Sequence, residues 1–223
     1  MGTEQLVTPQ ARSVTGYTVV LPPGWCRVPV RHGSAKAIRT AVDEALKAVP
    51  RNVPRDRIPP YRAELEGRLR SMVTAARKQG GVDLYLPVAP MHGLAVSASF
   101  IVSEGVIGVP GTDADPVAVV TYLAAQDAQS GPVTVDGAAA VRREHTAPAE
   151  PAAEVDAGSR RVDYMIPMPG SKHRWLIAAF STLGGGDPAD ELALALVQLF
   201  DAIMSTFRWS YSAGTATETE VPA

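Results

Sequence analysis

Two short segments, 142–145 and 159–163, carry the most closely spaced charged side chains of the chain. Alternate residues of a β-strand share a face, so Arg142 and Glu144 would lie on one side and Arg143 and His145 on the other. Arginine forks suit carboxylates and phosphates, and histidine changes its charge near neutral pH. One interpretation is therefore an anion site or a charged docking patch, formed by Arg142, Arg143, His145, Arg160 and Arg161.

The alternative for the same residues is a solvated face of a sheet. If the two segments are paired strands, Arg–Glu and Arg–Asp contacts form between them, and each stabilises the fold by about 0.2–1 kcal/mol. The sequence leaves both interpretations open.

Residues that could catalyse a reaction or bind a metal are not grouped in any recognisable motif. No two of the four histidines have the i,i+4 spacing of a zinc-binding helix, and Cys26 lacks a second thiol. The glycines 184–186 lack the Lys-Ser/Thr of a phosphate loop, and no serine lies in a G-x-S-x-G turn. His92 and His173 fall in two predicted hairpin loops, where the alternatives are solvated side chains or a shared metal or proton-transfer role. We therefore expect no catalytic residues, no metal site and no cofactor.

The composition is that of an ordinary globular protein, and it argues against several classes of partner. Of the 223 residues, 46% are hydrophobic and 20% are charged, and the net charge is −2. Without an excess of positive charge we expect no binding to nucleic acid. The longest apolar runs, such as Leu176–Phe180, are too short to insert into a membrane. A single cysteine and an N-terminus without a basic and an apolar region predict a cytoplasmic protein.

Apolar periodicity predicts four helices, of which the clearest follows Pro54 and ends at Gly80. Residues spaced by three or four form one apolar stripe along it: Ile58, Tyr61, Leu65, Leu69, Met72 and Ala76. The other side carries arginine–glutamate pairs at i,i+4, namely Arg62–Glu66, Glu64–Arg68 and Glu66–Arg70. We expect the stripe to pack on the sheet of the same domain rather than on a partner helix.

Three further helices are predicted, at Ala35–Val49 with Ser34 as N-cap, from Pro116 to about Gln126, and after Asp187. In the last of these, Asp187 would be the cap and Pro188 the first helical residue. We expect its buried face to consist of Leu192, Leu196, Leu199, Phe200, Ile203 and Phe207.

One segment of the chain resembles another. Between Val82–Val106 and Val162–Gly186, six of the 25 aligned residues are identical, and Phe100 aligns with Phe180. Each segment precedes an Asp-Pro pair and a predicted helix, which suggests a strand–loop–strand–helix unit used twice. The alternative is convergence of two hairpins on the same strand pattern. If the repeat is real, both hairpins lie in one antiparallel sheet with both phenylalanines buried.

Hairpins interrupted by helices predict an α+β fold, in which helices pack against a twisted antiparallel sheet. Another hairpin is predicted at 133–145, across the turn dipeptide Asp136-Gly137. We expect a single domain at residues 16–209, a flexible arm at 1–15 and a disordered tail at 210–223. The Pro-, Ala- and Glu-rich stretch 146–158 is expected to be an exposed excursion.

Two parts of the sequence resemble Mog1/PsbP-like domains. Leu21–Trp25 resembles their L-P-x-G-W opening, and Trp175–Thr182, leading to a helix that ends at Phe207–Trp209, resembles their close. The resemblance implies a twisted antiparallel sheet between helices, and members of that fold act mostly by binding other proteins. The sequence departs from the pattern in its two long helices within Ala35–Gly80. Its richness in Ala, Arg and Pro is also similar to that of proteins from high-GC actinobacteria.

These observations favour a non-enzymatic protein that binds another protein, as an adaptor or as an accessory or chaperone-like component of a larger assembly. One alternative is a module that binds a small molecule or an anion through the arginine-rich sheet face. Another is an enzyme whose site is assembled from scattered residues. The sequence does not identify the partner or the oligomeric state.

Overall fold

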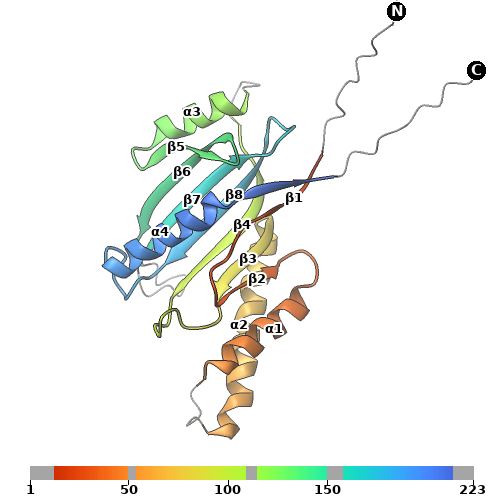
Figure 1. The fold of residues 1–223 in the computed structure, drawn as a ribbon, viewed down its shortest axis with the longest axis vertical. Helices are drawn as coiled ribbons and strands as arrows, with labels where there is room; N and C mark the ends of the chain where they lie inside the picture. Colours follow the sequence, from red (N-terminus) through yellow and green to blue (C-terminus); the bar gives the residue numbers. More distant parts are fainter. Residues whose placement is uncertain (1–12, 50–53, 109–114, 150–157, 213–223) are drawn as a thin grey trace, which may run out of the picture.

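The computed structural model describes residues 13–49, 54–108, 115–149 and 158–212 (Figure 1). Seven strands form an antiparallel sheet in the order β2-β3-β4-β8-β7-β6-β5, and β1 pairs with β9 in a separate two-stranded sheet. The α+β fold with an antiparallel sheet is confirmed. The strands are β1 (Val14–Thr18), β2 (Trp25–Pro29), β3 (Gly81–Pro87), β4 (Ala98–Val106), β5 (Ser130–Val135), β6 (Ala138–Ala147), β7 (Ser159–Pro167), β8 (Arg174–Thr182) and β9 (Arg208–Tyr211).

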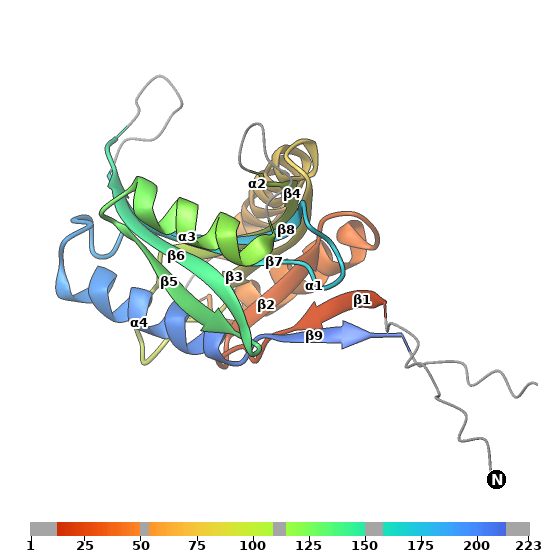
Figure 2. The ribbon, with the colours of Figure 1, turned by 90° about the horizontal axis from the view of Figure 1, so that it is seen from above.

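Helices cover both faces of the large sheet, as Figure 2 shows from above. One face, here called the α4 face, packs against α4 (Glu191–Ser205) and the β1–β9 pair. The opposite face, here called the α2–α3 face, carries α1 (Ser34–Lys47), α2 (Ile58–Lys78) and α3 (Pro116–Gln126). A short 3₁₀ turn, η1 (Arg55–Arg57), precedes α2.

Aromatic side chains form the centre of the core on the α4 face. Phe200 of α4 lies with its ring centroid 4.8 Å from Phe180 and 5.2 Å from Phe100, and all three are almost fully buried. Tyr85 of β3 stacks on Phe100 at 4.3 Å. The predicted buried face of the last helix is thus confirmed at its central residue, since α4 is held against the middle of the sheet.

The predicted N-caps of two helices are wrong. The last helix begins three residues later than expected, and the carboxylate of Asp190, not that of Asp187, accepts the backbone N–H of Ala193. In α1 the capping position is Gly33, in a left-handed conformation that favours glycine, and Ser34 is the first helical residue. A proline after an aspartate can thus belong to the turn before a helix rather than to the helix itself.

The apolar stripe predicted for α2 is confirmed only in part. Leu69 and Ala76 are buried, but Tyr61 and Met72 are 45% and 39% exposed, and Val73, which the stripe did not include, is buried next to Met72. Tyr61 lies in the first turn of α2, where α1 and α2 extend together beyond the end of the sheet (Figure 1). The three predicted i,i+4 ion pairs on the solvent side of α2 are present.

The two similar segments lie in one sheet, as predicted. Phe100 of β4 pairs directly with Phe180 of β8, and both are buried on the α4 face. The residue opposite Phe100 in its own hairpin is Tyr85, whereas the residue opposite Phe180 is Val162, which aligns with Val82 rather than with Tyr85. The registers of the two hairpins therefore differ by an odd number of positions, and an odd difference turns their first strands to opposite faces.

The mismatch of faces shows that the strand–loop–strand–helix unit is not repeated as a whole. Leu84 packs with α1 and α2, but Tyr164, to which it aligns, packs under α4. The helices that follow, α3 and α4, also lie on opposite faces (Figure 2). The structural similarity is limited to the second strand of each segment, β4 and β8, and these two strands pair with each other.

The folded part of the chain reaches two residues further at each end than the predicted domain 16–209. β1 begins at Val14 and β9 ends at Tyr211, and the two strands pair with each other. The remaining residues of the predicted arm and tail, 1–12 and 213–223, lie outside the described residues, as does 150–157 of the predicted excursion.

We expect Phe200→Ala to lower the free energy of unfolding by about 3–5 kcal/mol, because it removes the ring that contacts both central phenylalanines and leaves a cavity. Urea denaturation measures the change. Leu194→Ala, on the exposed side of the same helix (41% exposed), should cost about 0.5 kcal/mol or less. Equal stability of Phe200→Ala and the wild type would show that the α4 face is an interface rather than a core.

Candidate functional site

The five residues of the predicted anion or docking patch are divided between the two faces of the sheet, although Arg142, His145 and Arg160 all line one surface depression of about 410 Å³. Strands β6 and β7 pair as expected, with Arg143 opposite Asp163 and His145 opposite Arg161. Alternation then divides the patch: Arg142 and Arg160 lie on the α4 face, and Arg143, His145 and Arg161 lie on the α2–α3 face. The division between Arg142 and Arg143 was predicted. A functional role for any of the five stays a prediction.

On the α4 face, Arg142 is held in a network of ion pairs. Its guanidinium donates two hydrogen bonds of 2.9 Å to the carboxylate of Asp201 in α4, and a third of 2.8 Å to Glu144. Arg160 donates to the other oxygen of Glu144 at 2.7 Å, and the hydroxyl of Tyr164 donates to Asp201 at 2.8 Å. The network attaches α4 to β6 and β7.

The electrostatics of this network agree with a structural role. Burial alone would raise the pKa of Glu144, but hydrogen bonds from Arg142 and Arg160 outweigh burial and hold that pKa below its usual value. Both arginine side chains are less than a quarter exposed. Apart from Nη1 of Arg142, the nitrogens of both side chains already donate within the fold, which leaves little to bind an external anion.

On the α2–α3 face the charged residues are more loosely held. Arg143 donates to Asp127, just after α3, at 2.9 Å. His145 Nδ1 lies 3.9 Å from the carboxylate of Asp163, too far for a hydrogen bond, and it is buried without a partner among the described residues. Burial raises the pKa of Asp163 against the opposing effect of the nearby positive charges. Arg161 is exposed, and its guanidinium donates to the Ser159 hydroxyl at 3.2 Å.

Beside these residues, the described helices leave the middle of the α2–α3 face only partly covered. At the centre of β4 and β8, Phe100, Ala178 and Phe180 face α4 and are buried, whereas the neighbouring residues that face the other way are only half-buried. The half-buried residues are all uncharged: Ser99, Ile101, Ser103, Ile177, Ala179 and Ser181. A sheet face that meets only water usually carries polar or charged side chains, so Ile101, Ile177 and Ala179 are unusual beside the three serines there.

The strip continues into a groove of about 330 Å³ between α2 and the sheet. Met72 of α2 lines it, together with Val96, Leu183, Ser99 and Ser181 from the sheet and the loops beside it. Met72 and Leu183 are 39% and 36% exposed. We call the groove and the strip together the α2–α3 groove.

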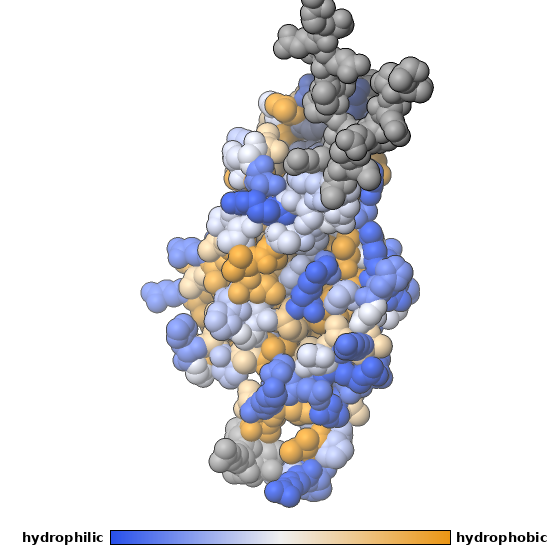
Figure 3. All heavy atoms as spheres, turned by 45° about the vertical axis from the view of Figure 1, so that its right-hand side comes forward, coloured by the Kyte–Doolittle hydropathy of each residue, from blue (hydrophilic) through white to orange (hydrophobic). Residues whose placement is uncertain are grey.

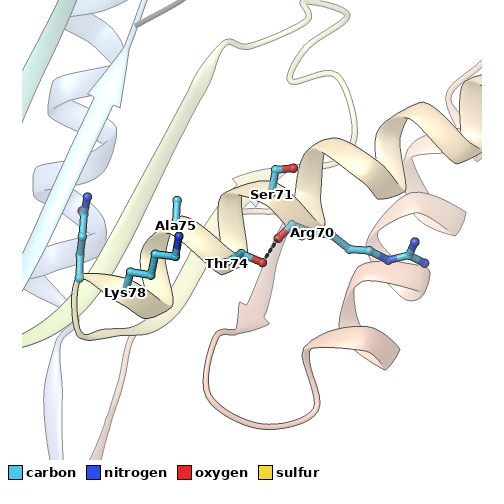
Figure 4. A pocket seen from close by; sticks show the side chains of 6 residues that line it. Arg70, Ser71, Thr74, Ala75 and Lys78 are labelled. Atoms are coloured by element: carbon cyan, nitrogen blue, oxygen red, sulfur yellow. Dashed lines mark hydrogen bonds between the residues drawn. The ribbon is translucent and has the colours of Figure 1, made fainter.

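A larger depression on α2 does not have the character of a site. Five of the six residues that line it, among them Arg70, Ser71 and Lys78, come from α2, and the sixth, Gln79, directly follows that helix (Figure 4). Figure 4 shows the Arg70 side chain directed away from Lys78, so their charges do not converge on a common point. Elsewhere, Figure 3 shows that apolar residues reach the surface in patches divided by hydrophilic side chains.

The described residues offer no other recognisable centre for chemistry. They contain no group of three or more His, Cys, Asp or Glu side chains that could hold a metal ion. His92 and His173 lie in loops at opposite ends of the sheet, because β4 and β8, which these loops precede, run antiparallel. Burial raises the pKa of the Cys26 thiol to about 11, which makes it a poor nucleophile near neutral pH. No helix in the described part of the chain is both long and apolar enough to cross a membrane.

Comparison with known proteins gives no family assignment. No protein-family model matches the sequence, and no curated protein matches it.

Sequence reasoning missed the α2–α3 groove, although part of its signal was present. In the sequence, Ser97 and Ser99 alternate with apolar residues, a pattern typical of a strand with one small or polar side. What could not be read is that β8, which comes much later in the chain, adds a second row of small residues beside it, with Ser181 opposite Ser99.

We expect Asp201→Ala to lower the free energy of unfolding by about 1–3 kcal/mol, because it leaves the guanidinium of Arg142 and the hydroxyl of Tyr164 without their shared acceptor. Thermal and urea denaturation measure the loss. The control is Glu64→Ala, which breaks an exposed pair with Arg68 on α2 and should cost about 0.5 kcal/mol or less. Similar losses for the two variants would contradict a structural role for the network.

Proposed function

We propose that this protein is a non-enzymatic adaptor that binds a helix of another protein in the α2–α3 groove. The observation that carries the proposal is the uncharged, half-buried strip along β4 and β8, bordered by the exposed side chains of Met72 and Leu183. Partly exposed apolar surface next to small side chains is what a docking partner can bury. Ile101 and Ile177 supply the largest apolar contacts on the strip.

A helix suits this surface better than a strand. β4 is hydrogen-bonded to β3 and β8, and β8 to β4 and β7, so their backbone groups are not free to pair with an added strand. Contact must be made by side chains, as it is made by the helices already on this face. α2 lies on one side of the strip and α3 near the other, so a third helix would complete the layer (Figure 2).

A positively charged residue at the border of the α2–α3 groove indicates the charge expected on the partner. Arg161 is exposed on the α2–α3 face next to Ser181, and its hydrogen bond among the described residues is to a neutral hydroxyl. A carboxylate on the bound helix would provide a stronger, charged acceptor. We therefore expect an amphipathic helix whose apolar face is bordered by Asp or Glu on one side.

The proposed role is that of an accessory or chaperone-like protein in a larger assembly. The resemblance of Leu21–Trp25 and Trp175–Thr182 to Mog1/PsbP-like domains supports it, since that fold acts mostly by binding proteins. We take the cytoplasm as the setting, because Cys26 is the only cysteine and is partly buried.

The test is photo-crosslinking in the cells that make the protein, with p-benzoylphenylalanine in place of Ser181 in the full-length chain. We expect one prominent adduct with a different protein, and mass spectrometry should map it to an amphipathic segment with acidic residues on one flank. The matched control carries the same photo-reactive residue at Thr121, which is exposed on α3.

A second variant tests whether the groove itself makes the contact. Ala179→Arg places a charged side chain on the half-buried strip and should reduce the adduct at least tenfold without changing the melting temperature by more than a few degrees. Three results would contradict the proposal: equal adducts at positions 181 and 121, an adduct made only of two copies of this chain, or an adduct unaffected by Ala179→Arg.

A further inference from the structure

A separate cavity on the α4 face brings together arginines that sequence analysis did not group. It has a volume of about 240 Å³ and lies between the β1–β9 pair and residues of β2, β4 and β8. Arg27, Arg31 and Arg174 line it, together with Glu104 and Trp209. These residues come from distant parts of the chain, so only the fold assembles them.

Two of the arginines are fixed by one carboxylate. Glu104 accepts a hydrogen bond of 3.1 Å from Nη1 of Arg31 on one oxygen, and one of 3.1 Å from Nη2 of Arg174 on the other. Burial alone would raise the pKa of Glu104, but the two arginines hold that pKa below its usual value, so the carboxylate is ionised near neutral pH. Both guanidinium groups keep further N–H donors that no described residue accepts.

The third arginine is fixed from the opposite side by a buried carboxylate. Asp83 is fully buried and accepts Nε and Nη2 of Arg27 at 2.7 and 2.9 Å, which leaves Nη1 without an acceptor among the described residues. The hydroxyl of Tyr17 also donates to Asp83, at 2.6 Å, and Tyr85 lies 2.9 Å from that hydroxyl. Burial raises the pKa of Tyr85 to about 12, so these hydroxyls stay neutral near neutral pH. Arg27 is thus positioned before any ligand arrives.

The charges of the cavity are not balanced. Three guanidinium groups are paired with two carboxylates, Asp83 and Glu104, which leaves one positive charge in excess. In addition, the indole N–H of Trp209, a residue that is 7% exposed, is buried with no acceptor among the described residues. That nitrogen is closed off from solvent, so Trp209 contributes its ring rather than its N–H to the wall of the cavity.

We propose that this cavity binds a small organic acid through a single carboxylate, with Arg31 and Arg174 as its main cationic contacts and Trp209 in its wall. One excess positive charge matches a carboxylate better than a phosphate, which carries nearly two negative charges near neutral pH. The cavity volume of about 240 Å³ equals that of about eight water molecules at about 30 Å³ each, so the ligand must be small. Val82 and Leu176, which also line the cavity, provide contact for a compact apolar body. This inference is independent of the helix groove, which lies on the opposite face.

The experiment uses the full-length protein and benzoate as the probe, in a buffer low in chloride. The chain has three tryptophans, so the ¹H–¹⁵N spectrum should show three indole signals, and Trp209→Phe identifies the one of interest. We expect benzoate to shift that signal saturably, whereas benzamide, of similar shape but uncharged, should not. Phosphate should bind more weakly than benzoate.

Two arginine variants and one control complete the test. Arg174→Gln and Arg31→Gln should each weaken benzoate binding at least tenfold, and because both side chains are substantially exposed, at least one should remain folded. Arg208→Gln is the matched control, since Arg208 neighbours Trp209 in β9 but lies 3.6 Å from Asp136 and does not line the cavity. Equal binding of benzamide, tighter binding of phosphate, or unchanged affinity in both folded variants would overturn the proposal.

Discussion

The rest of the structure depends on the contact between Phe200 of α4 and the paired rings of Phe100 and Phe180. Those two phenylalanines lie opposite each other on the central strands, so one helical side chain joins both halves of the large sheet. With Tyr85 stacked on Phe100, most of the bulk at the centre of the sheet is on the α4 face. Burial of aromatic rings supplies a large share of the apolar area in a core, which explains why one helix suffices on this side.

The same strands are small and neutral on their other face, and this asymmetry leaves a place for a partner. α1 and α2 cover the β2–β3 end, where Leu84 and Val28 are buried, and α3 packs on Val141 and Trp175. Between them, the strip along β4 and β8 carries serines and an alanine beside two isoleucines, and the described helices cover it only partly. A partner helix with larger side chains would fit there, whereas the α4 face has no such opening at its centre. The cavity near Trp209 also lies on the α4 face, at the end of the sheet that the β1–β9 pair covers.

Local sequence patterns predicted the helices and strands, whereas contacts between distant segments determine which side chains meet. Alternation correctly separated Arg142 from Arg143, and the Asp136-Gly137 turn correctly placed the β5–β6 hairpin. The sequence could not predict that Leu84 and Tyr164 lie on opposite faces of the sheet. This depends on the register of each hairpin, and hence on the number of residues in its loop. Nor could the sequence show that Arg142 meets Asp201, or that Arg27 and Arg174 share a cavity, since these contacts join segments that are distant along the chain.

The central claim is that the middle strands are closed on one face and accessible on the other, and thiol labelling at adjacent residues tests it most directly. In a Cys26→Ser background, single cysteines replace Ala178, which is 1% exposed under α4, and Ala179, which is half-buried on the α2–α3 face. Reaction of the purified protein with a thiol reagent should be at least a hundredfold faster at position 179 than at 178. Equal protection of both positions would show that the α2–α3 groove is already covered and would contradict the account.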